Sequence, residues 1–392
     1  MPTQQLHILC LSNGHGEDRI AVQVAVELRQ LGIDVSAMPI VGRGGAYQQE
    51  KISIVGPVRD TMPSGGFLYM DWKQLLGDIR GGLASLTLQQ MQAVRQFGAR
   101  YDLVLAVGDI VVQLLAYWSR RPYAFIGTAK SDYFIVGDRG PYSWWNRLKL
   151  KLSKRHPLTV YAPWERWLMH PCRCLAVFPR DTLTASSLQQ YGLPVFDMGN
   201  PMMDNLEPTA SEQNGLLASI PTERPALLLL PGSRSPEAYR NWSLMADVVR
   251  RLPDTVTNYA ALAPQLDRDR LHDAWPGELS PPVTFQGHFA GCAQRADVVL
   301  GMAGTANEQC VGLGKPVVTM PGAGPQFTYK FAETQRRLLG ASVTLAKNPE
   351  EAAMAIQRAI GHPSDLTANA TERMGTPGAS RRIARKIQQL LS

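Results

Sequence analysis

Short apolar runs alternate with amphipathic stretches of helix length along most of the chain. In the first half, the runs at 8–11 and 34–38 predict strands, and between them Ile20, Val24 and Leu28 recur at the spacing of one helix face. This alternation of strand and helix predicts a parallel sheet covered by helices, which is the α/β class. The same half carries further predicted strands at 103–107, 123–127, 174–178 and 195–198.

The second half repeats the pattern after a polar segment. Residues 205–224 contain two prolines and lack an apolar period, which indicates a linker. With 392 residues, the chain is also too long for one ordinary core. We therefore predict two doubly wound, Rossmann-like domains at 1–204 and 225–375, and an amphipathic closing helix in 376–392. In the second domain the pattern predicts strands at 226–230, 259–262, 283–285, 298–300 and 316–320, and a helix at 236–252.

The strand at 226–230 ends abruptly in a small-residue turn that opens a helix. Such a turn presents free backbone N–H groups and the positive end of the helix dipole to an anion. Gly232 lets the backbone approach a phosphate closely, Ser233 adds a hydroxyl donor, and Arg234 can hold a phosphate through two hydrogen bonds. The turn is therefore a candidate phosphate site, although an ordinary strand–helix turn with a surface arginine has the same pattern.

A second turn of this kind occurs later in the same domain. Gly304, Thr305 and Ala306 open a helix. Glu308 lies about one turn into it, where it can accept hydrogen bonds from both hydroxyls of a ribose or, alternatively, stabilise the helix dipole. Two anion-binding turns in one half-chain favour a site for a nucleotide diphosphate. Gln326, in a later glycine-rich loop, could address the hydroxyls of an attached sugar.

The N-terminal half offers two candidate general bases. His15 lies between two glycines in the first strand-to-helix turn, and its ordinary pKa is near working pH. A surface histidine that caps the turn is the alternative. Asp109 follows the strand at 103–107 and is either a second candidate base or the residue that orients His15. Glu17 and Asp18 are interpreted as charges of a helix N-terminus.

The basic residues are unevenly distributed. The net charge is +7, and residues 143–166 hold six Lys or Arg against one acid. Tryptophans are interleaved with them, and tryptophan with Lys or Arg is typical of a contact with an anionic membrane surface. A solvated basic loop with inward-facing tryptophans is the alternative. The residues assigned to an acceptor and membrane contact are Trp144, Trp145, Lys149, Lys151, Trp164 and Trp167, with Phe67 from the glycine- and aromatic-rich segment at 64–70.

Several classes of protein are disfavoured. The G-x-x-x-x-G-K-[ST] motif of P-loop enzymes is absent, and no G-x-G-x-x-G follows the first strand, which weakens a dehydrogenase interpretation. No run of eighteen apolar residues predicts a membrane span. The N-terminus is interpreted as a strand rather than a signal peptide, and five cysteines give no disulfide framework. We therefore expect a cytoplasmic protein at the membrane periphery, without a metal, cofactor or nucleic-acid partner.

Together these residues resemble the lipid-A-disaccharide synthase-related group of GT-B glycosyltransferases, and are similar to glycosyltransferase family 19. The motifs that carry the resemblance are at 175–179, 191–195, 199–201, 230–234 and 296–308. The resemblance implies two Rossmann-like domains that face each other across a cleft, with the closing helix packed back toward the N-terminal domain. It also implies a hexosyltransferase that moves a sugar from a UDP-sugar to a lipid or lipid-linked acceptor, with inversion and without a metal.

The N-terminal half departs from this group. The turn around His15 looks more like the Gly-Gly-His turn of peptidoglycan-precursor and galactolipid transferases, so the acceptor stays open. Two alternatives to a transferase remain. A UDP-sugar 2-epimerase shares the fold and the nucleotide motifs, and a non-catalytic binding or assembly protein could have retained the fold.

Overall fold

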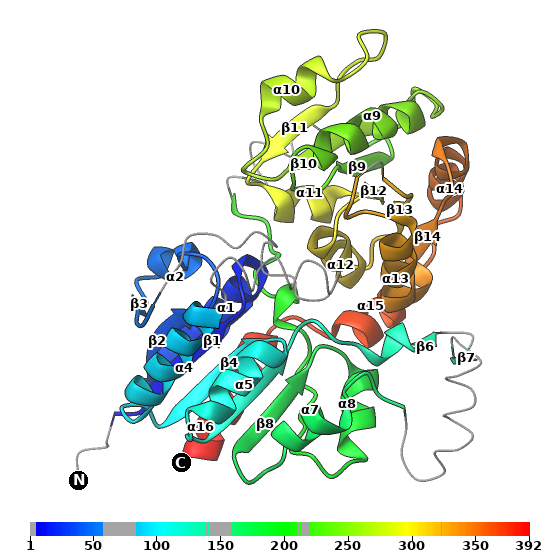
Figure 1. Ribbon diagram of the computed structural model, residues 1–392. Helices are drawn as coiled ribbons and strands as arrows, with labels where there is room; N and C mark the ends of the chain where they lie inside the picture. The colour runs from blue at the N-terminus through cyan, green and yellow to red at the C-terminus, as the bar shows by residue number, and fades with distance from the viewer. Residues whose placement is uncertain are drawn as a thin grey trace. The chain divides into compact units, whose positions relative to one another are not determined.

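The computed structural model describes residues 5–57, 84–137, 140–141, 158–210, 212, 220–322 and 324–392. The chain divides into two compact units (Figure 1). The N-terminal unit comprises Met1–Val136, Pro141–Asp204 and the C-terminal tail Pro377–Ser392. The C-terminal unit comprises Asn205–Thr376 and the short segment Gly137–Gly140.

The N-terminal unit is built on a parallel sheet of six strands, in the order β3-β2-β1-β4-β5-β8. Chain order therefore reverses between β1 and β4, where the first and fourth strands are neighbours. In doubly wound sheets, this reversal opens a crevice at the carboxyl ends of the two strands. The strands are β1 (His7–Ser12), β2 (Asp34–Pro39), β3 (Ser53–Ile54), β4 (Leu103–Gly108), β5 (Tyr123–Gly127) and β8 (Cys174–Pro179).

Helices cover both faces of this sheet because its strands are apolar on both sides. On β1, Ile8 and Cys10 belong to one core and Leu9 and Leu11 to the other, as the two-residue period of a strand requires. The first core includes α1 and α16, and the second includes α4 and α5. The helices are α1 (His15–Gln30), α2 (Gly45–Gln49), α4 (Ala84–Gly98), α5 (Ile110–Trp118), α7 (Pro163–Leu168), α8 (Thr182–Gln189) and α16 (Ala379–Leu391), with short 3-10 turns η2 (Asp132–Phe134) and η3 (Pro201–Met203).

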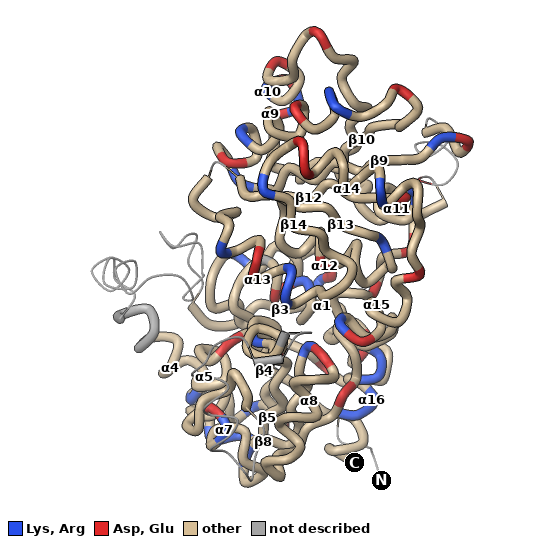
Figure 2. The backbone as a smooth tube through the Cα atoms, turned by 90° about the vertical axis from the view of Figure 1, so that its right-hand side faces the viewer, with Lys and Arg blue, Asp and Glu red and all other residues tan. Residues whose placement is uncertain are grey.

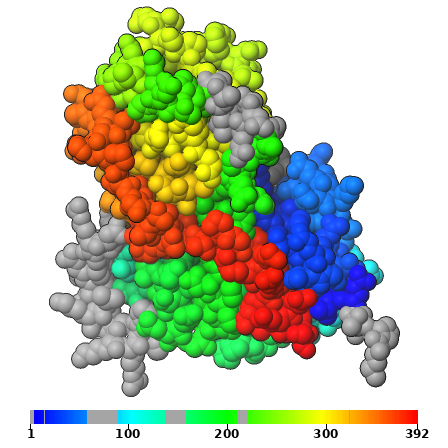
Figure 3. All heavy atoms as spheres, turned by 180° about the vertical axis from the view of Figure 1, so that it is seen from behind, coloured from blue at the N-terminus to red at the C-terminus, as the bar shows by residue number. Residues whose placement is uncertain are grey.

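The C-terminal helix α16 completes the N-terminal unit. It lies beside α1, as the red and blue segments of Figure 3 show, and it buries Ile383 and Ile387 in the core shared with α1. Its first turn is capped by Asp204, whose carboxylate accepts hydrogen bonds from the N–H groups of Gly378, Ala379 and Ser380 at 2.6, 3.1 and 2.8 Å. The prediction of a closing helix that returns to the N-terminal domain is confirmed.

The C-terminal unit repeats the same plan. Its six parallel strands run in the order β11-β10-β9-β12-β13-β14, so the reversal lies between β9 and β12. The strands are β9 (Ala226–Leu230), β10 (Thr257–Leu262), β11 (Val283–Gln286), β12 (Val298–Gly301), β13 (Val317–Thr319) and β14 (Val343–Leu345). The helices are α9 (Glu237–Val249), α10 (Arg268–Asp273), α11 (Phe289–Arg295), α12 (Thr305–Gly312), α13 (Tyr329–Leu339), α14 (Pro349–Gly361) and α15 (Thr367–Met374), and a 3-10 turn η6 (Gly340–Ser342) precedes β14.

One predicted strand is wrong. Residues 195–198 do not form a strand, because only Val195 pairs with the sheet, through an isolated bridge to Val177. The N–H of Val177 donates to the carbonyl of Pro194 at 2.8 Å and the N–H of Phe196 donates to the carbonyl of Val177 at 2.9 Å, but the segment leaves the sheet after these two bonds. In the described ranges, four strands of two or three residues escaped the prediction: β3, β14, β6 (Val136–Gly137) and β7 (Gly140–Pro141), the last two paired in a small sheet of their own. Within the described ranges, no helix is long and apolar enough to cross a membrane.

A buried carboxylate lies beside the sheet of the N-terminal unit. Asp132 is fully buried at the start of η2, where its carboxylate accepts hydrogen bonds from the N–H of Val160 at 2.8 Å and the hydroxyl of Thr159 at 3.0 Å. Burial raises the pKa of Asp132 to about 6; these bonds oppose the shift, and nearby Asp181 adds to it. Because the charged form is the less favourable one in the folded state, this carboxyl group stabilises the fold most when protonated.

Asp132→Asn should therefore change how stability depends on pH. The contribution of Asp132 to stability is fully present below its unfolded-state pKa of about 3.9 and is lost as the pH rises through about 6. The neutral amide does not titrate. Urea unfolding at pH 4, 5.5 and 7 measures the free energy of unfolding of both proteins. The difference, variant minus wild type, should rise by about 2–3 kcal/mol from pH 4 to pH 7. A difference that stays constant with pH would contradict the assignment.

Candidate functional site

The two glycine turns of the C-terminal unit meet at the point where the strand order reverses. β9 and β12 are parallel neighbours, with Leu230 opposite Gly301, so their following turns leave the same edge of the sheet. Met302 N–H donates to the carbonyl of Leu230 at 2.9 Å. Gly232 has a φ of +99°, and a Cβ built there would lie 3.0 Å from the carbonyl oxygen of Met302. Position 232 therefore requires glycine for two reasons: its φ is positive, and the second turn leaves no room for a side chain.

The side chains after Gly232 face away from the core. Ser233 and Arg234 are exposed, although the strand before them is fully buried. The backbone carbonyl of Ser233 accepts a hydrogen bond from Gln265 at 2.9 Å, which holds the turn from the side of β10. The hydroxyl and guanidinium groups predicted to bind a phosphate are thus carried on a fixed backbone at the edge of the sheet.

The second turn is held in place by two buried side-chain amides, those of Asn307 and Gln335. Asn307 donates to the carbonyl of Gly301 at 3.1 Å and to Gln335 at 2.8 Å. Gln335 in turn donates to the carbonyls of Ala303 and Gly304 at 3.1 and 3.0 Å. The turn's carbonyl groups are therefore bound to the protein, while Gly304, the N-cap of α12, has no side chain to cap the first turn. Its first N–H groups are suited to an anion.

The remaining predicted donor residues lie at the same edge. Thr305 is exposed at the start of α12, Ala306 follows it, and Glu308 is half-buried in the first turn. Gln326 is exposed in the loop after β13. Glu237, buried at the start of α9, accepts hydrogen bonds from the backbone N–H groups of this loop, with the shortest, from Phe327, at 2.6 Å.

Small residues let this loop pack closely against α9. A Cβ on Gly324 would lie 2.3 Å from the side chain of Glu237, and one on Gly322 would lie 2.5 Å from Asn241. Asn241 also donates to the carbonyl of Pro231 at 3.0 Å, so α9 holds the turn after β9 as well. The C-terminal unit thus gathers all eight predicted donor residues on turns that are tied to one another.

In the N-terminal unit, the two candidate bases follow neighbouring strands. β1 and β4 are parallel, with Ser12 opposite Val107, so the turns after them meet at the reversal of that sheet. Gly108 has a φ of +139°, and a Cβ there would lie 2.9 Å from the Cβ of Asn13. His15 is the first residue of α1, and its side chain lies outside the described part of the structure.

Asp109 serves as the N-cap of α5. Its carboxylate accepts a hydrogen bond from the N–H of Val111 at 2.8 Å and another from the side chain of Asn13. Burial raises the pKa of Asp109, while these two bonds and the charge of Lys130 oppose the shift and Glu165 adds to it. Asp109 is therefore a partly desolvated carboxylate at the edge where α/β sheets bind ligands.

Three charged residues that the sequence interpretation did not assign to a site surround Asp109. Lys130 forms a buried ion pair with Glu165 of α7, with Nζ 2.5 and 2.6 Å from the two carboxylate oxygens. Burial raises the pKa of Glu17, and the charge of Asp109 adds to that shift. The hydroxyl of Thr128 is 3.4 Å from Glu17. The sequence signal for this group was that Thr128 and Lys130 lie within three residues of the end of the predicted strand at 123–127.

The predicted acceptor and membrane residues are partly described. Trp164 and Trp167 lie on α7 and are 57% and 60% exposed. The others lie outside the described residues: Phe67, Trp144, Trp145, Lys149 and Lys151.

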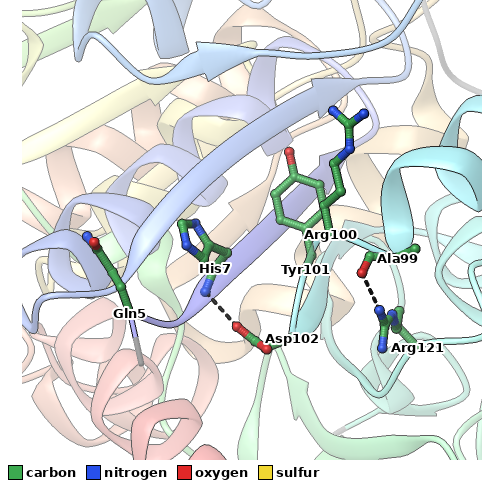
Figure 4. Close-up of a pocket in the computed structure, with 7 residues that line it drawn as sticks. All are labelled: Gln5, His7, Ala99, Arg100, Tyr101, Asp102 and Arg121. Atoms are coloured by element: carbon green, nitrogen blue, oxygen red, sulfur yellow. Dashed lines mark hydrogen bonds between the residues drawn. The ribbon is translucent and has the colours of Figure 1, made fainter. Parts of the chain in front are cut away.

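A pocket at the other edge of the N-terminal sheet is distinct from this site. It is lined by His7, Asp102 and Arg121, among others, and the N–H of His7 donates to Asp102 at 2.8 Å (Figure 4). His7 is the first residue of β1, so the pocket lies at the amino ends of the strands. Because ligands of doubly wound sheets bind at the carboxyl ends, the candidate site is not here.

Sequence comparison identifies relatives for part of the chain. It is 24% identical to a lipid-A-disaccharide synthase of Pseudomonas putida over 242 residues, and the aligned region covers 59% of this chain and 61% of the relative. A lipid-A-disaccharide synthase of Alkalilimnicola ehrlichii is 31% identical over 162 residues, or 37% of this chain and 40% of the relative. The chain is similar to lipid-A-disaccharide synthases. It spans about three fifths or less of the length of these relatives.

No protein-family model matches the chain, so its similarity to glycosyltransferase family 19 stays a prediction. Solved structures match over nearly the whole length. The calicheamicin glycosyltransferase CalG4 has a TM-score of 0.65 at 15% identity, covering 99% of both chains. The UDP-GlcNAc 2-epimerase from Neisseria meningitidis bound to UDP-GlcNAc has a TM-score of 0.60 at 13% identity, covering 98% of this chain and 100% of that one. The predicted GT-B-like α/β class with two Rossmann-like sheets is confirmed.

Proposed function

We propose that this protein is a glycosyltransferase that moves a sugar from a UDP-sugar to a lipid or lipid-linked acceptor at a membrane surface. The observation that carries the proposal is the meeting of two anion-binding turns at the strand-order reversal of the C-terminal unit, with Gly232 packed against the turn that opens α12. The similarity to lipid-A-disaccharide synthases supports transfer from a UDP-sugar and a lipid-linked acceptor.

The donor is assigned to the C-terminal unit. The N–H groups of the two turns and the guanidinium of Arg234 face the diphosphate, and Glu308 accepts hydrogen bonds from the ribose hydroxyls. Gln326 addresses the donor sugar from a loop that Glu237 holds in place. The residues assigned to the donor are Gly232, Ser233, Arg234, Gly304, Thr305, Ala306, Glu308 and Gln326.

The acceptor and the base are assigned to the N-terminal unit. His15 or Asp109 takes the proton of the acceptor hydroxyl as its oxygen attacks the anomeric carbon. In the same displacement the bond to UDP breaks, UDP leaves with the bonding electrons, and the anomeric configuration inverts. The positive ends of two helices and Arg234 stabilise the negative charge that develops on the leaving diphosphate, which is the work that a metal ion does in other transferases.

The reaction is placed at the cytoplasmic face of a membrane. Trp164 and Trp167, exposed on α7, are assigned to the acceptor and membrane contact, with Phe67, Trp144, Trp145, Lys149 and Lys151 from outside the described residues. All five cysteines are free, which suits a reducing compartment.

Titration with UDP tests the donor assignment directly. We expect isothermal titration calorimetry to give a dissociation constant below about 1 mM, within the usual range for enzyme substrates. Absence of binding at millimolar UDP would remove the basis of the proposal. Incubation with labelled UDP-sugars and a lipid extract should then transfer label to the lipid phase.

An epimerase is the second candidate, because a UDP-GlcNAc 2-epimerase shares the fold over the whole chain. NMR spectra of UDP-GlcNAc incubated with the protein alone distinguish the two: an epimerase interconverts the C2 epimers, whereas a transferase leaves the donor sugar unchanged until an acceptor is added. Binding of UDP-sugars without epimerisation, hydrolysis or transfer would indicate a non-catalytic binding or assembly protein.

A further inference from the structure

Four buried polar side chains are linked in a row behind the turn that follows β1. The hydroxyl of Ser12, the last residue of β1, donates to the carboxylate of Asp18 in α1 at 2.5 Å, and the hydroxyl of Tyr47 in α2 donates to Ser12 at 2.7 Å. The sulfur of Cys10 lies 3.7 Å from the hydroxyl of Tyr47. None of the four side chains is more than 1% exposed. Because a buried polar group is costly unless it is hydrogen-bonded, these bonds hold their members in fixed positions.

The row of hydrogen bonds ends at Asp18. A hydroxyl group has one proton to donate, and Tyr47 and Ser12 each direct theirs toward this carboxylate. Burial raises the pKa of Tyr47 well above its ordinary value and that of Cys10 to about 12, so both stay protonated at neutral pH. Asp18 lies in the first turn of α1, as the sequence indicated, but it is buried there. Its carboxylate therefore acts inside the protein.

Asp18 holds both neighbours of Asn13. Its carboxylate binds the hydroxyl of the preceding residue, and its backbone N–H donates to the carbonyl of the following residue, Gly14, at 2.6 Å. Asn13 itself is 8% exposed, and its side chain donates to the carboxylate of Asp109. The contact between the turns after β1 and β4 thus depends on a residue that Asp18 fixes from both sides.

We infer that Asp18 is a positioning residue for the candidate base: by fixing Ser12 it keeps the amide of Asn13 on the carboxylate of Asp109. The inference deepens the proposed function and rests on it for the role of Asp109 as a base. Asp109 also accepts the N–H of Val111, so its carboxylate is held from two directions. A catalytic group needs this support from neighbours that are themselves locked, because small displacements lower the rate.

The bond from Asn13 also affects the protonation of Asp109. It lowers the pKa of Asp109, as the N–H at the cap of α5 and the charge of Lys130 do, against burial and the charge of Glu165. From α1, Glu17 is a further neighbour, and the charge of Asp109 raises its pKa. α5 carries no charged residue, and α7 carries one acid and one base, red and blue in Figure 2. Loosening the bond from Asn13 should therefore raise the pKa of Asp109.

Carbon-13 NMR titration of the aspartate carboxyl groups in the full chain tests the inference without relying on activity. The signal of Asp109 is the one that Asp109→Asn removes. Ser12→Ala and Asp18→Ala should each raise the pKa of Asp109 by about 1, the effect of losing one hydrogen bond to a charged group. Removing the charge of Asp18 would by itself lower this pKa, so a rise in both variants reports the lost bond. If Asp18→Ala does not fold, Ser12→Ala decides, because it removes a single oxygen atom.

Two further variants are controls. Asp18→Asn keeps an oxygen for the hydroxyl of Ser12, and Tyr47→Phe breaks the row on the far side of Ser12, so both should leave the pKa of Asp109 unchanged. Lower thermal stability in Ser12→Ala and Asp18→Ala with an unchanged pKa would show a purely structural role and overturn the inference, as would equal shifts in all four variants. If the pKa shifts but the acid limb of the turnover profile does not, Asp109 is positioned as inferred but is not the base, and the failure lies in the proposed function.

Discussion

Replacing Asp109 by asparagine is expected to lower the turnover number by about 10²–10⁴-fold if Asp109 is the base, the range that general base catalysis contributes. The amide keeps an oxygen to accept the N–H of Val111, so the cap of α5 survives and a loss of activity is not a loss of fold. Turnover with saturating UDP-sugar and lipid acceptor, together with unchanged thermal unfolding, measures the effect.

His15→Ala is the necessary companion variant. If His15 is the base and Asp109 orients it, both substitutions lower turnover, and the double variant is little worse than the single ones, because residues that act as a unit are not additive. If both single variants keep near-full turnover, neither residue is the base. Glu17→Gln would then be the next variant to measure, since burial raises its pKa beside Asp109.

The pH profile adds an independent readout. A base must be deprotonated to act, and burial raises the pKa of Asp109. Turnover should therefore fall on the acid side at a pH above the ordinary value for aspartate, about 3.9. A profile that is flat down to pH 4 would exclude Asp109, and an acid limb that Asp109→Asn leaves in place belongs to another group.

Arg234→Ala has the second large expected effect. A guanidinium that binds a diphosphate through charged hydrogen bonds contributes about 1.5–3 kcal/mol, so UDP affinity should fall by about 10–100-fold. Turnover should fall further, by about 10²–10³-fold, because charge on the leaving diphosphate increases in the transition state. Calorimetry with UDP and steady-state kinetics measure the two effects separately.

Two further variants make the Arg234 result specific. Arg234→Lys keeps the charge but loses the bidentate geometry, so it should recover only part of the affinity. Arg250→Ala removes an arginine that pairs with Asp247 just beyond the other end of α9, and it should bind UDP like the wild type. If Arg234→Ala also binds UDP normally, the guanidinium does not contact the diphosphate.

The sequence predicted those features that depend on short-range periodicity. Ile20, Val24 and Leu28 recur at helical spacing, and all three are buried on α1. The apolar runs at 8–11 and 226–230 became β1 and β9, because a continuous apolar run suits a strand covered on both faces. The failure at 195–198 arises because this segment pairs with β8 only at Val195, and a local pattern does not show how many residues of a segment reach a neighbouring strand.

The turns at the ends of strands were also predictable, because a glycine after an apolar run marks where the chain leaves the sheet. The residues that hold those turns were not. Glu237 binds the backbone of Phe327 from 90 positions away, and Gln335 binds Ala303 from 32 positions away. Lys130 and Glu165 are separated by 35 positions. Such contacts depend on how helices pack on the sheet, which no local pattern encodes.

The cap that Asp204 places on α16 has a consequence for the order in which the protein is made. Gly378, whose N–H Asp204 binds, lies 174 positions further along the chain, and α16 ends at Leu391. During synthesis domains usually fold in the order in which they emerge. Here the unit that emerges first cannot complete the core around α1 until α16 has emerged from the ribosome as well. The part of the chain that is synthesised second is therefore the first that can finish folding.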